Sequence, residues 1–567
     1  MTTCTIQSVS GYFGRLLPLL AALLLTPAVA VPDTTISDTL HARVTDIRAG
    51  QNVVINTSSI ASAIVLPALY AKRDYAPVWS NPASVLQLIS AIEQADLDGL
   101  DPADYNLDTL KLLLERNNET GDANPERTAN LDLLLTDSLI RLGYHLFFGK
   151  VDPEELDSDW NMTRYIEDLE ALLQKDDAIK LGRVDALLTS LMPQSRTYQR
   201  LKQALASYRR YQQLGGWQPV PDGGALKAGM SDERVPLLRA RLIATHDLAT
   251  QDMFLPTFDD AVEAGVKHFQ RRHGLEADGV VGQKTLTELN VPVESRIAQL
   301  RVNLERARWM LHDLPDTYVM ADIAGFNVRL FRNDEVVWET RAVVGQPFRM
   351  SPVFRSTLTY LDINPTWTVP PTVLDKDLLP ELRRNPNHLA EKGMQVIDYQ
   401  GNPVDAGNID WSRYNGHSFP WLIRQKPGPK NALGRIKFMF PNRHSVYLHD
   451  TPSKSLFAKP ERALSSGCIR IEHPYDLAEL LLAGNAGWDR GRLERAINTL
   501  QTRSVSLEQP VTILLMYWTA SVDDDGTVLF SRDIYERDPP IIRGLGEPFR
   551  FREREIIRGP LQMTALH

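Results

Sequence analysis

The sequence predicts a multidomain protein of the α+β class, and three changes of pattern along the chain support that prediction. Leucines recur at helical spacing from about residue 60 to residue 213. Three further helical stretches follow between residues 230 and 290. From Tyr318 onward, apolar and polar residues alternate with the period of a β-strand. The 567 residues are enough for about three or four domains of ordinary size.

The composition is that of a folded chain and excludes several classes of protein. Hydrophobic residues make up 43% of the chain and charged residues 23%, which is enough apolar material for ordinary cores. With 62 Lys and Arg against 71 Asp and Glu, the formal charge is −9, so we expect no nucleic-acid partner. The chain has two cysteines, which excludes a disulfide-stapled fold and a multi-cysteine zinc or iron–sulfur site.

The first 30 residues are predicted to be a secretory signal peptide. Arg15 precedes the apolar run Leu16–Leu25, and the small residues Ala28 and Ala30 fit the site that signal peptidase recognises. The run is too short to span a membrane, and no later segment is long and apolar enough, so we expect no transmembrane segment after cleavage. An uncleaved anchor is the alternative. Cleavage after Ala30 would leave an exported protein with Cys468 as its single thiol.

Residues 31–225 are assigned to a helical domain. Leu110, Leu113 and Leu114 lie on one face of a predicted helix, and a second leucine stripe follows in the next run. The glycine- and proline-rich stretch Gly215–Gly229 is typical of a linker. No motif in this domain indicates chemistry.

Residues 226–295 are assigned to a compact module of three helices. Val262, Val266 and Phe269 lie on one face of its second helix, which Gly274 ends. A short third helix follows a glycine-containing turn. On its own, this pattern predicts a small helical module without indicating its task.

Residues 296–520 are assigned to a mainly β domain, and residues 521–567 to a C-terminal extension. A connecting helix opens the domain, and a β-meander begins at Tyr318. Further strands are predicted at Leu358–Ile363, Arg435–Phe440, Ser445–His449 and Val511–Trp518, with a helix at Pro474–Leu482.

An insertion from about residue 370 to residue 429 interrupts the β domain. It is rich in Pro, Asn and Gly, which predicts an excursion out of the sheet, and loops of this length are often functional lids. Four aromatic residues are available in it to cover a substrate: Trp411, Tyr414, Phe419 and Trp421.

A cysteine and a histidine near predicted strands are the candidate catalytic residues. Cys468 lies 19 residues after His449, and a histidine within hydrogen-bond reach of a thiol favours the nucleophilic thiolate. Gly467 lets the backbone approach a substrate closely, and main-chain N–H groups around Cys468 are candidates to bind an oxyanion. Tyr447 shares a strand face with His449. With one cysteine and no carboxylate at ligand spacing, we expect no metal site and no cofactor.

Two sets of residues match the motifs of known families. Phe269-Gln270, Gly274-Leu275, residues 278–282 and Thr285 form a pattern by which the module resembles the type 1 peptidoglycan-binding domain. In the β domain, His449 with residues 465–470 resembles the catalytic signature of YkuD-type L,D-transpeptidases. Residues 364–370, 427–434 and 440–442 are similar to the large Gram-negative subgroup of that family. In that subgroup a helical scaffold domain precedes the binding and catalytic domains, and the catalytic domain carries a capping insertion.

The resemblance implies a periplasmic enzyme that forms 3→3 cross-links between peptidoglycan stem peptides. Cys468 would attack the carbonyl between the third residue of the donor stem, meso-diaminopimelate, and D-Ala at position four, which releases D-Ala. The acyl group would then pass to the side-chain amine of diaminopimelate in the acceptor stem. His449 would act as the base, oriented by the main-chain carbonyl of Asp450. Carbapenems would acylate the thiol. Other cell-wall synthesis proteins are further candidate partners.

Four residues are candidates for substrate binding. They are Tyr447, Arg470, Ser466 in the cysteine loop, and Trp421 in the insertion. Arg470 is predicted either to pair with a substrate carboxylate or to neutralise Glu472, and Ser466 either to bind within the cysteine loop or to stabilise its turn. The Asp450 carboxylate is discounted as a third catalytic group, because adjacent residues of a strand point to opposite faces.

Two other functions stay open at this point. A papain-like cell-wall peptidase also pairs cysteine with histidine, although there the cysteine comes first in the chain. A non-catalytic peptidoglycan-binding protein could keep the fold for interaction alone, against which the intact Cys468, Gly467 and His449 argue.

Overall fold

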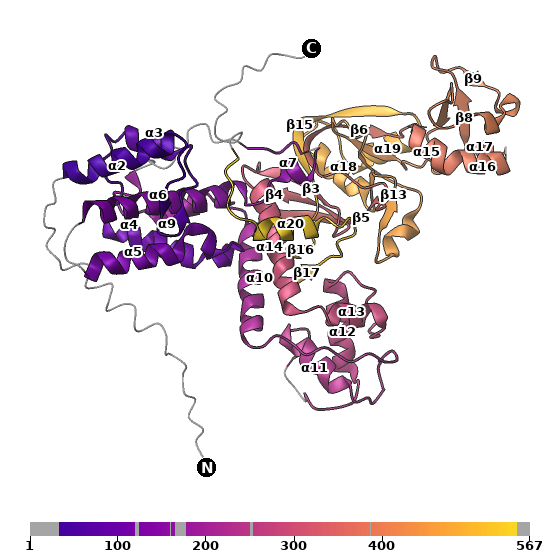
Figure 1. Ribbon diagram of the computed structural model, residues 1–567. Coiled ribbons are helices and arrows are strands. Elements are labelled where there is room, and N and C mark those ends of the chain that lie inside the picture. The colour runs from indigo at the N-terminus through magenta and orange to yellow at the C-terminus, as the bar shows by residue number, and fades with distance from the viewer. Residues whose placement is uncertain are drawn as a thin grey trace. The chain divides into compact units, whose positions relative to one another are not determined.

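The computed structural model describes residues 33–119, 124–158, 160–164, 177–249, 253–385 and 387–552 (Figure 1). The predicted signal peptide lies outside the described residues. The chain forms two compact units: Met1–Val151, Arg164–Gln194 and Arg543–His567 make up the first, and Asp152–Thr163 and Ser195–Ile542 the second. Within the described ranges, no helix has the length and apolar character needed to cross a membrane.

The first unit is a helical bundle around one almost fully buried helix, α6 (Pro125–Phe148). The Asn124 side chain accepts hydrogen bonds from the first main-chain N–H groups of α6, as an N-cap residue does. The buried carboxylate of Asp132 accepts the main-chain N–H groups of Val78 and Trp79, which anchors the preceding loop. The surrounding helices are α2 (Asp33–Arg48), α3 (Leu66–Ala71), α4 (Pro82–Glu93), α5 (Leu107–Glu119) and α9 (Val184–Ser190).

Two long helices of the second unit lie side by side, α10 (Arg196–Gln213) and α14 (Val293–Met310) (Figure 1). Arg308 on α14 is fully buried, where it pairs with Glu305 at 2.6 Å and donates to the Tyr198 hydroxyl on α10 at 3.3 Å. This buried contact explains why α10, assigned from sequence to the helical domain, clusters with the second unit.

The three-helix module consists of α11 (Val235–Ala244), α12 (Asp260–Arg272) and α13 (Gln283–Leu289). Its core is apolar, with Val262, Val266 and Phe269 fully buried as the helical spacing predicts. The side-chain amide of Gln270 donates to Asp278, to the Val280 carbonyl and to Thr285, at 2.8, 3.0 and 3.1 Å. Several residues of the peptidoglycan-binding motif therefore hold the fold together.

The mainly β domain is built on a nine-stranded mixed sheet in the order β13-β5-β14-β12-β11-β6-β15-β3-β4. Because β4 also pairs with β5, the sheet closes on itself. The predicted helix at Pro474–Leu482 is confirmed as α18. The strands are β3 (Thr317–Asp322), β4 (Asn327–Arg332), β5 (Glu335–Gly345), β6 (Phe354–Ile363), β11 (Ile436–Met439), β12 (Leu448–His449), β13 (Ala463–Ser465), β14 (Ile469–Ile471) and β15 (Arg503–Met516).

The elements after β15 complete the second unit. A short hairpin joins β16 (Ala520–Val522) to β17 (Val528–Phe530), and the helix α20 (Asp538–Gly546) begins in this unit, which ends at Ile542. The helix α19 (Arg490–Asn498) lies between α18 and β15 in the chain.

The insertion folds as a small subdomain with a core of its own. Its four-stranded sheet has the order β7-β10-β8-β9, with short helices around it (Figure 1). Trp411 and Phe419 are 5% and 6% exposed within that core, so the expectation that they cover a substrate is wrong for these two residues. The elements are β7 (Trp367–Thr368), α15 (Pro371–Val373), η5 (Leu374–Leu378), α16 (Leu379–Arg384), α17 (His388–Glu391), β8 (Met394–Ile397), β9 (Pro403–Val404) and β10 (Leu422–Gln425).

Candidate active site

Neighbouring strands of the β domain bring a row of polar residues onto one face of the sheet. Lys437 on β11 pairs in register with Asp362 on β6 and with His449 on β12, and His449 pairs in register with Arg470 on β14. Residues directly opposite each other on paired strands point to the same face. The row therefore surrounds His449 with the two cations Lys437 and Arg470.

The imidazole of His449 is buried and fixed by a main-chain carbonyl. Its Nδ1 donates to the carbonyl oxygen of Asp450 at 2.5 Å, which leaves Nε2 as the acceptor of the neutral ring. The Asp450 carboxylate instead accepts the Arg435 N–H at 2.8 Å and the Lys454 ammonium at 2.7 Å. Strand alternation thus turns this carboxylate away from the imidazole, as predicted.

The surroundings of His449 keep its imidazole neutral. Burial lowers its pKa to about 3, together with the positive charges of Arg470 and Lys437, although the hydrogen bond to the Asp450 carbonyl acts in the opposite direction. Near neutral pH, this histidine therefore carries no charge, and its ring is a weaker base than that of an ordinary histidine.

The Cys468 thiol is half-buried in the loop between β13 and β14. Its Sγ donates to the Ser445 carbonyl at 3.8 Å, and Tyr447 forms further hydrogen bonds with it. His449 is not among the partners of the thiol that the described residues provide. Burial raises the pKa of Cys468, although Tyr447, Lys437 and Arg470 lower it. The structure therefore favours a neutral thiol beside a neutral imidazole, in place of the thiolate expected from the sequence.

The cysteine loop is braced by a serine that the sequence analysis missed. Ser465 Oγ donates to the Cys468 carbonyl at 2.6 Å and accepts the Gly467 N–H at 3.2 Å. Gly467 has φ +109°, which only glycine adopts readily, and its carbonyl accepts the Ser351 hydroxyl at 2.7 Å. The Cys468 N–H has no acceptor among the described residues, so it is a main-chain donor available to an oxyanion.

Ser466 binds outside its own loop, contrary to one of the two sequence interpretations. Its hydroxyl accepts a hydrogen bond from Arg349 at 2.7 Å, and Arg349 also forms two contacts with Asp377, at 2.5 and 2.9 Å. Asp377 belongs to η5 of the insertion. Arg349 therefore connects the insertion to the cysteine loop, a contact between distant segments that no sequence motif announced.

Arg470 and Trp421 differ in how the structure places them. Glu472 pairs with Arg341 at 2.6 Å, so the prediction that Arg470 neutralises it is wrong. No described carboxylate forms an ion pair with Arg470, whose positive charge acts on Cys468. Trp421 packs against the core of the insertion, with its ring 5.6 Å from that of Phe419.

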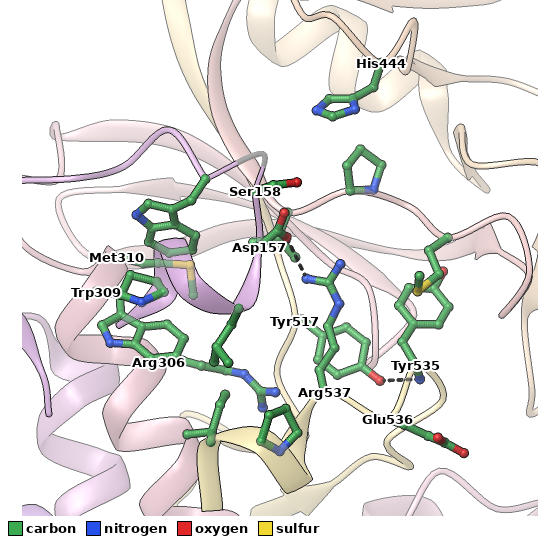
Figure 2. A pocket seen from close by; sticks show the side chains of 18 of the residues that line it. Asp157, Ser158, Arg306, Trp309, Met310, His444, Tyr517, Tyr535, Glu536 and Arg537 are labelled. Carbon is green, nitrogen blue, oxygen red and sulfur yellow. Dashed lines mark hydrogen bonds and ion pairs between the residues drawn. The ribbon is translucent and has the colours of Figure 1, made fainter. Parts of the chain in front are cut away.

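A cavity of about 680 Å³ borders the cysteine loop at Ser466 and Gly467. Such a volume lies in the range of about 300–1,000 Å³ that is usual for ligand sites. Arg537 reaches across part of it to Asp157, at 3.2 Å (Figure 2). Aromatic side chains form much of the remaining wall: Trp160, Trp309, Tyr517 and Tyr535.

Family models match three parts of the chain. They are described as "L,D-transpeptidase catalytic domain" over residues 316–495, "Putative peptidoglycan binding domain" over residues 231–289, and "Scaffold domain" over residues 65–205. The chain therefore carries a YkuD-type L,D-transpeptidase catalytic domain, joined to a peptidoglycan-binding domain and a helical scaffold domain. The resemblance seen in the sequence and the multidomain α+β fold class are both confirmed.

A bacterial relative is similar to part of this chain. A protein of Haemophilus influenzae described as "Putative L,D-transpeptidase" is 36% identical over 251 residues, which are 44% of this chain and 50% of the relative. The chain thus spans about half the length of that relative.

Two solved structures are also similar to part of the chain. An L,D-transpeptidase from Xylanimonas cellulosilytica is 15% identical with a TM-score of 0.17, covering 53% of this chain and 100% of that one. One from Stackebrandtia nassauensis is 14% identical with a TM-score of 0.20, covering 53% and 97%.

The raised pKa of Cys468 predicts how its alkylation depends on pH. Because the thiol is protonated at pH 7, iodoacetamide should modify Cys468 more slowly than a free cysteine, and the rate should keep rising past about pH 8.5, the ordinary thiol value. Following the Cys468 peptide by mass spectrometry measures this rate separately from Cys4. Tyr447→Phe should slow the reaction further, since it removes a hydrogen bond that lowers the pKa. A rate that is already constant between pH 6 and 8 would contradict the neutral thiol.

The ion pair between Arg349 and Asp377 is expected to restrain the motion of the insertion. Asp377→Asn should speed amide hydrogen exchange in residues 371–425 by about twofold to fivefold, the range expected for losing a partly exposed ion pair. Glu472→Gln is the matched control, because it breaks a similar pair with Arg341 outside the insertion. Unchanged exchange in Asp377→Asn would show that the pair does not restrain the insertion.

Proposed function

We propose that this protein is a periplasmic L,D-transpeptidase that forms 3→3 peptidoglycan cross-links through a thioacyl intermediate on Cys468. The observation that carries the proposal is the placement of Cys468 on the loop into β14, which pairs in parallel with the strand that bears His449. The buried imidazole, which the Asp450 carbonyl holds through Nδ1, is the group we assign as general base, and the Cys468 N–H is the donor we assign to an oxyanion.

The proposed acylation step begins with a change in the orientation of the thiol. Cys468 Sγ turns from the Ser445 carbonyl toward His449, whose Nε2 takes the thiol proton as sulfur attacks the carbonyl carbon of meso-diaminopimelate that is bonded to the D-Ala nitrogen. The Cys468 N–H donates to the resulting oxyanion. When the C–N bond to D-Ala breaks, His449 returns the proton to the departing amine, which leaves a thioester and a neutral imidazole.

Transfer to the acceptor stem reverses these roles. The side-chain amine of a second diaminopimelate attacks the thioester, His449 accepts a proton from the amine, and the sulfur leaves and recovers that proton. A new amide bond replaces the thioester, so no net redox change or cofactor is involved. A water molecule in place of the amine would make the protein a peptidase, so exclusion of water decides between these outcomes.

The charges around the thiol support a substrate that carries carboxylates. Arg470 has a positive charge near Cys468 and no ion-pair partner among the described residues, so we assign it to a diaminopimelate carboxylate. The cavity beside Ser466 and Gly467 is large enough to take part of a stem peptide.

Cys468→Ala should abolish cross-linking while the protein stays folded, because the methyl group replaces a half-buried thiol without adding volume. Mass spectrometry of the products from disaccharide tetrapeptide should show dimers and free D-Ala with the wild type and neither with the variant. A carbapenem should add its mass to the wild type alone. Dimers made by Cys468→Ala would disprove this nucleophile, and shortened stems without dimers would favour the peptidase.

His449→Ala should lower the rate of acylation by about 10² to 10⁴, the usual effect of losing a general base. Raising the pH toward and beyond about 8.5 should recover part of that rate, because the thiol then ionises without help. Stopped-flow measurement of carbapenem acylation across pH tests both statements. Ser466→Ala is the comparison: losing one hydrogen bond should cost about 0.5–1.5 kcal/mol, a far smaller change. An inactive Ser466→Ala beside an active His449→Ala would reverse the assignment.

A further inference from the structure

A second cavity, of about 800 Å³, lies in the second unit between the three-helix module and the catalytic domain. The module contributes the end of α12 and part of α13, and the catalytic domain contributes the turn between β3 and β4 and the segment before β13. We call this space the junction cavity. Its charged lining residues are Arg271, Lys284, Lys459, Arg462 and Arg532, with Glu276, Glu288 and Glu461.

The junction cavity has an excess of positive charge, although the whole chain is negative. Glu461 pairs with Arg532 at 2.7 Å, and Glu288 pairs with Arg296 outside the lining at 2.6 Å. Glu276 is then the remaining acidic residue of the lining. The other four basic side chains form no ion pair with any described residue. This local excess favours an anionic ligand.

One of these four cations is held in place by the main chain. Arg462 donates to the carbonyl oxygens of Ala342, Lys459 and Phe326, at 3.1, 2.8 and 3.1 Å. Burial, with the nearby charge of Arg341, lowers the pKa of Arg462 to about 10, so the side chain stays charged at neutral pH. Its guanidinium is thus oriented in advance, which reduces the entropy lost when an anion binds.

Buried aromatic contacts hold the two walls of the junction cavity together. The Phe530 ring at the end of β17 stacks on His273 of the module, with centroids 5.6 Å apart. Arg296 at the start of α14 lies over the same Phe530 ring, 4.5 Å from its centroid. Phe530 is 3% exposed, so these contacts form a packed interface between module and catalytic domain.

We propose that the junction cavity binds the carboxylates of a peptidoglycan stem peptide, with Arg271 and Lys284 acting from the module and Lys459 and Arg462 from the catalytic domain. Stem peptides carry several carboxylates, so one stem can satisfy cations on both walls. This inference rests on the proposed function for the identity of the ligand. Its consequence is that the module and the catalytic domain bind the wall jointly, which should lower the KM for substrate without changing the chemical step.

The test compares binding of a soluble disaccharide tetrapeptide to full-length variants that all carry Cys468→Ala, which prevents turnover. Adding Lys284→Glu and Lys459→Glu, one from each wall, should raise the Kd by about tenfold or more. Lys227→Glu with Lys180→Glu is the matched control, since both lysines are exposed and lie outside the lining. The control pair should change the Kd less than about twofold. Equal Kd values for the two pairs would overturn the proposal.

The chemistry of the ligand is tested with two further probes. A tetrapeptide whose carboxylates are amidated should bind the protein with both lysines intact as weakly as the unmodified tetrapeptide binds the Lys284→Glu, Lys459→Glu variant. Inorganic phosphate at equal concentration should compete poorly with the unmodified tetrapeptide. Competition by phosphate as effective as by the stem peptide would show a general anion site and overturn the assignment to stems.

Assays of variants that keep the Cys468 thiol distinguish a failure of the junction-cavity proposal from a failure of the proposed function. Carbapenem acylation of Cys468 should be unchanged in Lys284→Glu, Lys459→Glu, whereas the KM for cross-linking should rise with kcat unchanged. If the wild type makes cross-links and the KM does not rise, the junction site is wrong and the function stands. If stems bind through the junction cavity but no cross-links form, the function is wrong and the site stands.

Discussion

The parallel pairing of β12 with β14 is the constraint on which the active site depends. It sets His449 opposite Arg470. It also holds Cys468, which directly precedes β14, close to the strand that carries His449. A shift of one residue in this register would turn His449 to the other face of the sheet. The closed sheet protects the register, because β12 and β14 are each bonded to a second strand, β11 and β5. The hydrogen bonds of Ser465 and Ser351 then fix the loop itself.

The same arrangement determines the electrostatics of the site. The row of residues that contains His449 also places Lys437 and Arg470 beside it, so both cations oppose a charge on the imidazole. Burial separately opposes a charge on the thiol. A site with these properties keeps the Cys468 thiol protonated at rest, so the proposed attack relies on proton transfer as it occurs. Under the proposed function, reactivity is then confined to a bound substrate, which limits side reactions of this thiol.

The insertion and the three-helix module are tied to the rest of the second unit by charged and aromatic contacts. Arg349 connects the insertion to Ser466, and Phe530 packs between the module and α14. The first contact acts at the cysteine loop itself, because Ser466 is next to Gly467. The second joins the three-helix module to the start of α14, the helix that opens the catalytic domain.

The sequence by itself determined the pattern-based features: the helical bundle, the module with Val262, Val266 and Phe269 in its core, the helix Pro474–Leu482, and Cys468 with His449 as the candidate pair. These follow from local periodicity and from residue types whose chemistry is distinctive. Only the tertiary structure decided that Ser465 braces the loop, that Arg349 reaches Asp377, that Glu472 belongs to Arg341, and that Trp411 and Phe419 are core residues of a folded insertion. The protonation states were decided there too. Burial and the partners of a charge depend on segments far apart in the chain, and local spacing contains no information about which of those segments meet.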